Sequence, residues 1–410
     1  MKLFSKKGRQ MNNAGIIKNI DRIIITGDIL RLTNNKPGGQ DNNIKWFYYL
    51  FKFFLEKTAP DLKVNLLLAS TDNSTFNVKT FYQLNDLNFS TKSWARLYDM
   101  ASVNEKAEEY FLNCFKNSFV VGYELPKIFK SLMEKLEIDF IDFKIHPCRF
   151  SDDIFFGILS NNQSINKILK KHSLSENHLF AMAGIHKAAI SRLEQLNIEK
   201  DFCLIVGQTP VDQSLIENGK VLNLSDFTKE LKSIKDNNPN LYFKPHPYAA
   251  KDIKLNDMLS QLDAKVINDN IYQILCHENI KSIYSISSSV IEEAKYFGIN
   301  TISFKKDISH EHFPVYNNYF DAKFWIDILG CVCETDKSVS HKIPDKPNRL
   351  RDNLGIYWGY NISTFKNMQS TISIDDRKTI SEMYSFLNNS KLMIVYNKLK
   401  QLKEKIWPCS

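Results

Sequence analysis

The sequence predicts an α/β protein built from two Rossmann-like domains that face each other across a cleft. Short apolar runs with strand character alternate with amphipathic helical runs, and this alternation occurs twice, before and after about residue 180. The 410 residues, of which 43% are hydrophobic, are enough for two domains of ordinary size. We therefore expect a first domain over residues 1–180, a second over 181–375 and a helical segment over 376–410.

The first half contains the strand-like and helical runs of an α/β domain. Strands are predicted at 22–27, 63–70 and 138–147, because these short runs are dominated by apolar residues. Helices are predicted at 46–59 and, at the end of this half, at 178–196. Short apolar strands separated by helices favour a parallel sheet with helices on both faces.

The second half repeats this pattern with shorter segments. Strands are predicted at 202–208, 241–247, 280–287 and 300–304, and helices at 224–237, 269–278 and 288–298. Ser225 is expected to cap the first of these helices, because a serine hydroxyl accepts a hydrogen bond from the first helical turn. A second parallel sheet follows from the alternation.

Polar residues follow three strands of the second half. In α/β sheets, ligands bind beyond the carboxyl ends of the strands, so these residues are expected to form one site. The candidates for the site are Gln208 and Asp212, then Lys244, His246 and Pro247, then Ser287, Ser288, Ser289 and Glu292. Each of them also has a simpler interpretation, as a turn residue, a structural histidine or a helix cap, and their joint placement favours function.

His246 lies between two prolines, in the run KPHP. A proline fixes its own φ and holds the preceding residue in an extended conformation, so Pro245 and Pro247 restrict the backbone on both sides of the imidazole. Ser288 and Ser289 open a predicted helix. The free N–H groups and positive dipole end of a helix suit a phosphate group.

The first half offers a second set of candidates. Arg149 is suited to bidentate binding of a carboxylate, and Asp152 or Asp153 to the role of acid or base. The alternative is that these aspartates are the N-cap and a first-turn acid of a helix. Arg31 and Gln40 lie in the loop after the first strand and are candidates for acceptor binding. That loop lacks the G-x-G-x-x-G and P-loop patterns, which argues against a dinucleotide or ATP site.

Composition and charge exclude several classes of function. The net charge is +8, yet no compact motif of interleaved basic and aromatic residues indicates nucleic-acid binding. No apolar run approaches the ~20 residues that span a bilayer, and no apolar region typical of a secretory signal follows the basic start of the chain. The seven scattered cysteines fit a reducing cytoplasm. The lysine-bearing helical run at 391–410 is expected either to pack on the protein or to contact anionic lipid headgroups peripherally.

No metal site is expected. The chain has no C-x-x-C motif and no spaced set of histidines and cysteines. It also has no Asp-x-Asp pair, which many nucleotide-sugar enzymes use to hold a divalent metal on a diphosphate. A metal-free reaction with a donor that carries a single phosphate is therefore favoured, and no cofactor is expected.

Three stretches of the second half resemble the bacterial retaining β-Kdo glycosyltransferases of lipopolysaccharide O-antigen and capsule assembly. They are LIVGQTPVDQSLI, YFKPHPY and YSISSSVIEEAKYFGI, and the resemblance is clearest over residues 202–304. A His-Pro motif and a serine-rich turn also occur in bacterial sialyltransferases, which likewise use CMP-sugars. The spacing of Gln208 and Asp212 points to the Kdo enzymes. The acidic-acidic-Gly motif typical of such sialyltransferases has no clear copy in the first half.

The resemblance implies a GT-B-type fold, with CMP-β-Kdo bound in the second domain and a glycan acceptor, lipid-linked, in the first. It implies that Asp212 is the nucleophile, and that His246, Ser288 and Ser289 hold the phosphate and nucleotide, with Lys244 as a further cation. The C-terminal helix is expected to cross back to the first domain. Kdo is a ulosonic acid with an oxocarbenium-like transition state, and retention by two displacements needs a carboxylate beside its anomeric carbon.

Two rival interpretations remain at the level of the sequence. In an inverting, sialyltransferase-like enzyme, Asp212 is structural and Asp152 or Asp153 deprotonates the acceptor. Alternatively, the chain is a non-catalytic protein of the same fold that binds a nucleotide or a glycan. The discriminating feature is a carboxylate within bonding reach of the anomeric carbon.

Overall fold

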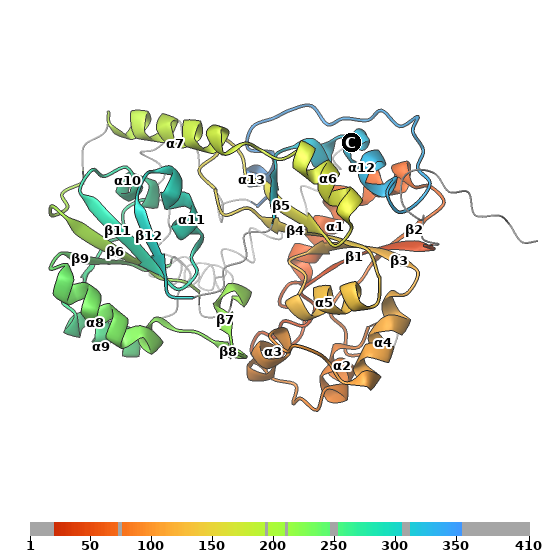
Figure 1. The fold of residues 1–410 in the computed structure, drawn as a ribbon, viewed down its shortest axis with the longest axis horizontal. Coiled ribbons are helices and arrows are strands. Elements are labelled where there is room, and N and C mark those ends of the chain that lie inside the picture. Colours follow the sequence, from red (N-terminus) through yellow and green to blue (C-terminus); the bar gives the residue numbers. More distant parts are fainter. Residues whose placement is uncertain are drawn as a thin grey trace, which may run out of the picture.

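The computed structural model describes residues 20–72, 76–192, 196–209, 212–246, 253–305 and 312–354. It confirms the α/β fold class, with a separate sheet in each half of the chain (Figure 1). Pro247 and the predicted helical segment over 376–410 lie outside the described residues. Within the described ranges, no helix is both long and apolar enough to cross a bilayer.

The first sheet has six strands in the order β13-β5-β4-β3-β1-β2. The strands are β1 (Arg22–Gly27), β2 (Lys63–Leu66), β3 (Ser118–Tyr123), β4 (Phe140–Ile145), β5 (Phe156–Ser160) and β13 (Phe313–Val315). Strands β1 to β4 are parallel, as predicted, whereas β5 and β13 join the sheet in antiparallel pairs. β1 is buried on both faces because Ile23 and Ile24 belong to the separate hydrophobic cores that cover the two sides of the sheet.

Helices pack on both faces of the first sheet. They are α1 (Asp41–Thr58), α2 (Val78–Leu84), α3 (Thr91–Tyr98), α4 (Glu105–Phe115), α5 (Lys127–Lys135) and α6 (Gln163–Lys171). α1 places Phe47 and Phe51 in one core. α3 places Trp94 and Leu97 in the other, and its N-terminus is capped by Ser90, whose hydroxyl accepts a hydrogen bond from the N–H of Ser93.

The second sheet has five parallel strands in the order β10-β9-β6-β11-β12. They are β6 (Phe202–Val206), β9 (Leu241–Lys244), β10 (Lys265–Val266), β11 (Ile280–Ser285) and β12 (Asn300–Ser303). The helices of this half are α7 (Glu176–Ile190), α8 (Thr228–Asn237), α9 (Ile253–Gln261), α10 (Ile271–Leu275) and α11 (Ser289–Tyr296), with short 3-10 helices η1 (Gln213–Leu215) and η2 (Leu224–Phe227). Asn223, and not Ser225, begins the helical segment before α8, because Asn223 and Asp226 form a reciprocal capping box.

Residues 313–354 return to the first half, although the sequence placed them in the second domain. β13 pairs with β5, and α12 (Ala322–Leu329), which follows the short helix η3 (Asn318–Phe320), contacts α1. Trp325 stacks on Phe143, and Leu350 of α13 (Arg349–Leu354) is buried in the same core. Hydrophobic burial therefore stabilises the packing of residues 313–354 on the first half.

Candidate active site

Gln208 joins the ends of two neighbouring strands of the second sheet. β6 and β11 are adjacent and parallel, so their carboxyl ends lie side by side. The side-chain oxygen of Gln208 accepts a hydrogen bond from the N–H of Ser287 at 2.8 Å, and its amide nitrogen donates to the Ser287 hydroxyl oxygen at 3.1 Å. The predicted convergence of these two loops is therefore present, and Gln208 acts as the link between them.

Asp212 lies in the loop that follows β6. Its carboxylate accepts a hydrogen bond from the N–H of Ser214 at 2.8 Å and caps η1. The carbonyl oxygen of Ser214 accepts hydrogen bonds from the Ser287 hydroxyl at 2.9 Å and from the Lys305 ammonium at 3.0 Å. The loop is thus held by contacts to the rest of the second half, while Asp212 itself remains half-buried.

The N-terminus of α11 lies directly beyond β11. Ser288 is its N-cap, and its hydroxyl accepts a hydrogen bond from the N–H of Val290 at 3.4 Å. Ser289 is the first helical residue, and Glu292 stands in the first turn; both are half-buried. Ser288 therefore has a capping role, and the helix terminus next to it is placed at the same sheet edge as Gln208.

Lys244 and His246 differ in what surrounds them. The Lys244 side chain is buried, and its ammonium donates to the carbonyl oxygens of Asn268 and Asp269 at 3.4 and 2.6 Å. Burial lowers the pKa of Lys244 to about 8. These contacts direct Lys244 toward the loop after β10 and give it a structural role, so it is not placed as the further cation for a phosphate.

His246 is half-buried and lies beside the end of β6. A Cβ atom on Gly207 would approach the backbone nitrogen of His246 to 3.4 Å and the Phe243 ring to 3.1 Å. The glycine therefore allows the chain after β9 to pass close to the chain after β6. This close approach brings His246 next to the loop that carries Gln208.

The candidates of the first half are distributed differently. The buried carboxylate of Asp153 accepts hydrogen bonds from the backbone N–H groups of Ile154, Leu350 and Arg351 at 2.7, 3.2 and 3.1 Å. It ties the returning segment to the loop after β4, which is a structural role and not that of a base. The backbone N–H of Arg149 donates to a carboxylate oxygen of Glu293 at 2.8 Å, which links the two halves.

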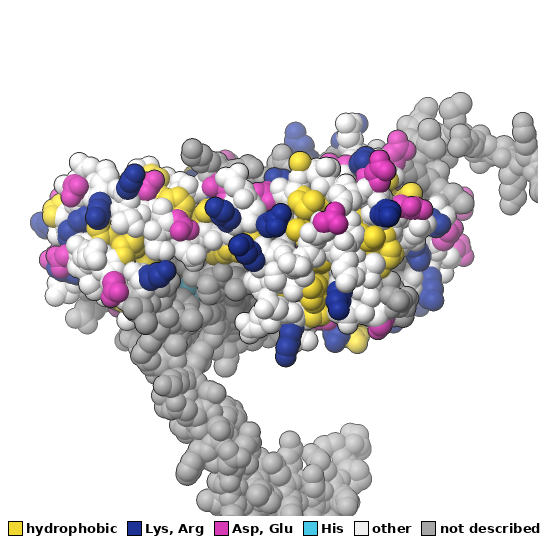
Figure 2. Space-filling view, turned by 90° about the horizontal axis from the view of Figure 1, so that it is seen from below, with side chains coloured by type: hydrophobic (Ala, Val, Ile, Leu, Met, Phe, Trp, Pro, Cys, Tyr) yellow, Lys and Arg dark blue, Asp and Glu magenta, His cyan; other side chains and the backbone are white. Residues whose placement is uncertain are grey.

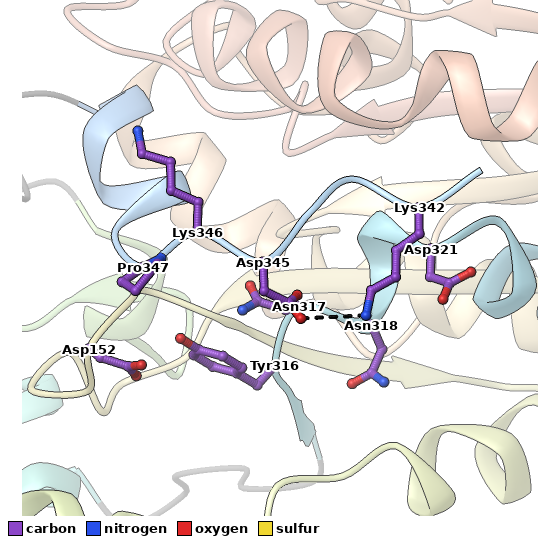
Figure 3. A pocket seen from close by; sticks show the side chains of 9 residues that line it. All are labelled: Asp152, Tyr316, Asn317, Asn318, Asp321, Lys342, Asp345, Lys346 and Pro347. Atoms are coloured by element: carbon purple, nitrogen blue, oxygen red, sulfur yellow. Dashed lines mark hydrogen bonds and ion pairs between the residues drawn. The ribbon is translucent and has the colours of Figure 1, made fainter.

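Gln40 and Asp152 have other surroundings. Gln40 is buried at the start of α1, where its side-chain oxygen accepts a hydrogen bond from Asn43 at 2.6 Å. Asp152 is exposed and lines a pocket of about 400 Å³ (Figure 3). The other lining residues are Tyr316, Asn317, Asn318, Asp321, Lys342, Asp345, Lys346 and Pro347. None of them comes from the second sheet or its loops.

The sequence reasoning missed two carboxylates that follow strands of the first sheet. β1 and β3 are paired, with Gly27 opposite Tyr123, so Asp28 and Glu124 emerge at the same sheet edge. Burial raises the pKa of Asp28 to about 7, and the Arg31 guanidinium opposes this rise. The signal was present in the sequence, because each residue directly follows an apolar strand that ends at a sheet edge.

Glu124 has a strained backbone and a perturbed carboxyl group. Its φ is 54°, a left-handed conformation that is uncommon outside glycine and is often found at functional sites. Its pKa is raised to about 7, first by burial and then by the negative charge of Asp212, while Arg31 opposes the rise. Glu124 and Asp212 therefore lie within electrostatic reach of each other, although they belong to different halves.

Other groups surround this pair of carboxylates. The pKa of Tyr98 is raised by burial and then by Asp28, Asp142 and Asp212, and that of Lys144 is lowered by burial, an effect that Glu124 and Glu292 oppose. Three pairs among these groups interact electrostatically across the two halves, namely Glu124 with Asp212, Tyr98 with Asp212, and Lys144 with Glu292. Arg31 stands over the Trp94 ring at 5.6 Å on the first-half side.

The arrangement provides several carboxyl groups, Glu124 and Asp212 among them, the cations Arg31 and Lys144, and a helix N-terminus, all at or beyond the carboxyl ends of strands of the two sheets. A carboxylate whose pKa is near 7 can act as a base or an acid at neutral pH, and one that stays ionised can act as a nucleophile. Among the residues that the structure describes, no group of three histidine, cysteine, aspartate or glutamate side chains could hold a metal ion. On the face drawn in Figure 2, basic and acidic side chains are interspersed, without a broad basic patch of the kind that binds nucleic acid.

No protein-family model and no curated protein matches the chain. Among solved structures, it is similar to a β-Kdo 2,7-transferase, KpsC of Thermosulfurimonas dismutans, with 13% identity, a TM-score of 0.34 and coverage of 75% of this chain and 90% of that one. A β-Kdo 2,4-transferase structure of the same organism matches with 14% identity, a TM-score of 0.29 and coverage of 46% and 68%. The UDP-GlcNAc 2-epimerase of Methanocaldococcus jannaschii matches with 13% identity, a TM-score of 0.21 and coverage of 71% and 85%. These values are low, and the function of this chain is inferred from its own residues.

Proposed function

We propose that this chain is a retaining glycosyltransferase that moves Kdo from CMP-β-Kdo to a glycan acceptor. The observation that carries the proposal is the placement of Asp212 and Glu124, from opposite halves, within electrostatic reach of each other. A retaining double displacement needs one carboxylate as nucleophile and a second group that handles the acceptor proton. The sequence resemblance over residues 202–304 supports Kdo as the transferred sugar.

In the first step, Asp212 attacks the anomeric carbon of Kdo as the bond to the CMP phosphate breaks. The leaving phosphate takes the electron pair, and we propose that His246 and the N-terminus of α11 stabilise its charge. Arg31 and Lys144 are the cations that suit the Kdo carboxylate. The products of this step are CMP and a glycosyl ester on Asp212.

In the second step, Glu124 removes the proton of an acceptor hydroxyl, whose oxygen displaces Asp212 from the face that CMP left. Formation of the ester neutralises Asp212, and the loss of that charge lowers the pKa of Glu124. Glu124 is therefore more readily ionised at the moment when a base is needed. The reaction requires no metal, and we propose a lipid-linked acceptor at the cytoplasmic face of the inner membrane.

A second candidate function is inverting transfer from CMP-sialic acid. It is supported by the hydrogen bond from the Ser214 N–H to Asp212, because this bond gives Asp212 the structural role of a helix cap. Glu124 would then deprotonate the acceptor for a single displacement. The two functions differ in whether a covalent intermediate forms on Asp212.

The test is incubation of the whole protein with CMP-Kdo alone, followed by measurement of CMP release and by intact-protein and peptide mass spectrometry. We expect one added Kdo on the peptide that contains Asp212. Asp212→Ala should abolish the adduct, and Asp236→Ala, at an exposed position on α8, should not. CMP release without an adduct and with an inverted product supports the second candidate, and absence of turnover with either donor supports a non-catalytic protein.

A further inference from the structure

The chain passes from one half of the molecule to the other between two adjacent residues, shortly after Asp212. Leu215 is 2% exposed and belongs to a hydrophobic core of the second half, together with Ile205. Ile216, also 2% exposed, belongs to the core of the first half that contains Trp94. Within the described ranges, Ile216 is the only fully buried member of that core contributed by the second half of the chain.

Ile216 begins a two-stranded hairpin formed by β7 (Ile216–Glu217) and β8 (Lys220–Val221). Its turn is Asn218-Gly219, with φ values of 52° and 70°, which is the pairing that a tight two-residue hairpin requires. Both strands contact α3 of the first half, as Figure 1 also shows. The hairpin is thus a projection of the second half that lies on a helix of the first.

The tip of the hairpin is bonded to the end of α3. The N–H of Gly219 donates to a carboxylate oxygen of Asp99 at 3.1 Å, and the other oxygen of Asp99 lies 3.5 Å from the Lys127 ammonium. A Cβ atom on Gly219 would lie 3.4 Å from the Cα of Arg96, so the backbones of the two elements are in close contact. Burial at Ile216 and a charge-assisted hydrogen bond at Gly219 therefore fix the hairpin at both ends.

The same hairpin determines where Asp212 can lie. Asp212 caps η1, which ends at Leu215, so three residues separate it from Ile216. The chain before the hairpin is held to the second half through Ser214, by Ser287 and Lys305. The position of the Asp212 carboxylate is consequently set by contacts with both halves, and not by its own sheet alone.

We propose that the β7–β8 hairpin is a positioning element, which α3 holds through Ile216 and Asp99 so that the Asp212 carboxylate lies opposite Glu124. This inference rests on the proposed function, because it assigns Asp99, Ile216 and Gly219 to the placement of the nucleophile. None of the three touches the reacting atoms. A carboxylate displaced by about 1 Å loses much of its effectiveness as a nucleophile, by up to ~10²-fold.

The first experiment separates placement of the nucleophile from donor binding. In Asp99→Ala and Ile216→Ser, the rate of glycosyl-enzyme formation at saturating CMP-Kdo should fall by about 10-fold or more, while the donor Kd changes by less than about 3-fold. Asp99→Asn keeps an acceptor oxygen for the Gly219 N–H and should restore most of the rate. Lys127→Met removes only the ion pair and should behave like the wild type. Equal loss in Asp99→Asn and Asp99→Ala, or an unchanged rate in both Asp99→Ala and Ile216→Ser, overturns the inference.

A backbone control uses two glycines with nearly the same φ. Gly219→Ala and Gly298→Ala carry the same left-handed strain, since their φ values are +70° and +72°, but nothing lies within 4 Å of a Cβ on Gly298. We expect similar losses of thermal stability in the two variants and a loss of glycosyl-enzyme formation only in Gly219→Ala. A loss of rate in both variants would mean that general destabilisation, and not the hairpin contact, is responsible.

A cross-link tests whether the hairpin remains docked during turnover. A Cβ on Gly219 would lie 3.9 Å from the Cβ of Arg96, within the roughly 3.5–4.5 Å range of a disulfide. The oxidised Arg96→Cys/Gly219→Cys protein should form the adduct at a rate within about 3-fold of its reduced form. The reason is that a disulfide does not change the position of a hairpin that stays docked on α3 throughout the reaction. A larger loss that a reductant reverses would show that the hairpin must leave α3, which overturns the inference.

Amide hydrogen exchange distinguishes a failure of the hairpin inference from a failure of the proposed function. We expect the Gly219 amide to be protected in the wild type and to exchange about 10-fold faster in Asp99→Ala. Protection without any turnover of CMP-Kdo would refute the proposed function and the placement role built on it, but leave the docking intact. Turnover with an unprotected hairpin would refute this inference and leave the proposed function standing.

Discussion

Replacing Glu124 by glutamine should stop the proposed reaction halfway. The first step uses Asp212 and the donor, and a neutral glutamine resembles the protonated Glu124 that the pKa of about 7 allows at neutral pH. The second step needs a base, whose loss lowers the rate by about 10²–10⁴-fold. Glu124→Gln should therefore release one equivalent of CMP, accumulate Kdo on Asp212 and transfer it very slowly.

The pH dependence of kcat/KM in the wild type gives a second quantitative test of Glu124 as the base. Burial and then the charge of Asp212 raise the pKa of Glu124 from 4.5 to about 7, against the opposing effect of Arg31, and the contribution of Asp212 is lost once Asp212 is esterified. The acid limb of kcat/KM for the acceptor should therefore lie between pH 4.5 and 7. One pH unit below its midpoint, the rate should fall to about a tenth of the plateau.

The assay is rapid-quench mass spectrometry of the adduct together with steady-state kinetics over pH, with Glu134→Gln on the exposed face of α5 as a matched control. Undiminished acceptor kinetics in Glu124→Gln would refute the assignment of the base. If the acid limb persists in Glu124→Gln but disappears in Asp28→Asn, the base is Asp28, the other first-half carboxyl group with a pKa of about 7.

Three further predictions follow from the geometry. Asp153→Ala should lower the free energy of unfolding in urea by about 2–4 kcal/mol, because three buried N–H groups lose their acceptor. Asp152→Ala should change the free energy of unfolding by less than about 0.5 kcal/mol. Equal effects of the two substitutions would contradict the structural role of Asp153. His246→Ala should lower kcat by about 10²-fold with the fold intact, and a near-normal kcat would leave His246 without a catalytic role. Turnover should survive EDTA; activity that disappears and returns with manganese would refute the metal-free mechanism.

Local pattern in the sequence determined β1 of the first half and much of the second half. β1 spans Arg22–Gly27 as predicted, and β6, β9, β11 and β12 fall within one to three residues of their predicted ranges. Short apolar runs and capping residues act over a few positions, so the sequence alone can indicate such elements. Because parallel strands end at one edge, the meeting of Gln208 with Ser287 was also predictable.

The tertiary structure decided which carboxylate comes within electrostatic reach of Asp212. Asp153 and Glu124 are both acidic residues that follow strands. The carboxylate of Asp153, however, accepts hydrogen bonds from backbone N–H groups of α13. Glu124 instead follows β3, which pairs with β1, and it comes within electrostatic reach of Asp212, which precedes the β7–β8 hairpin bonded to α3. The pKa of a carboxyl group depends on its burial and on charges that other segments bring near it, and those segments are far apart in the sequence.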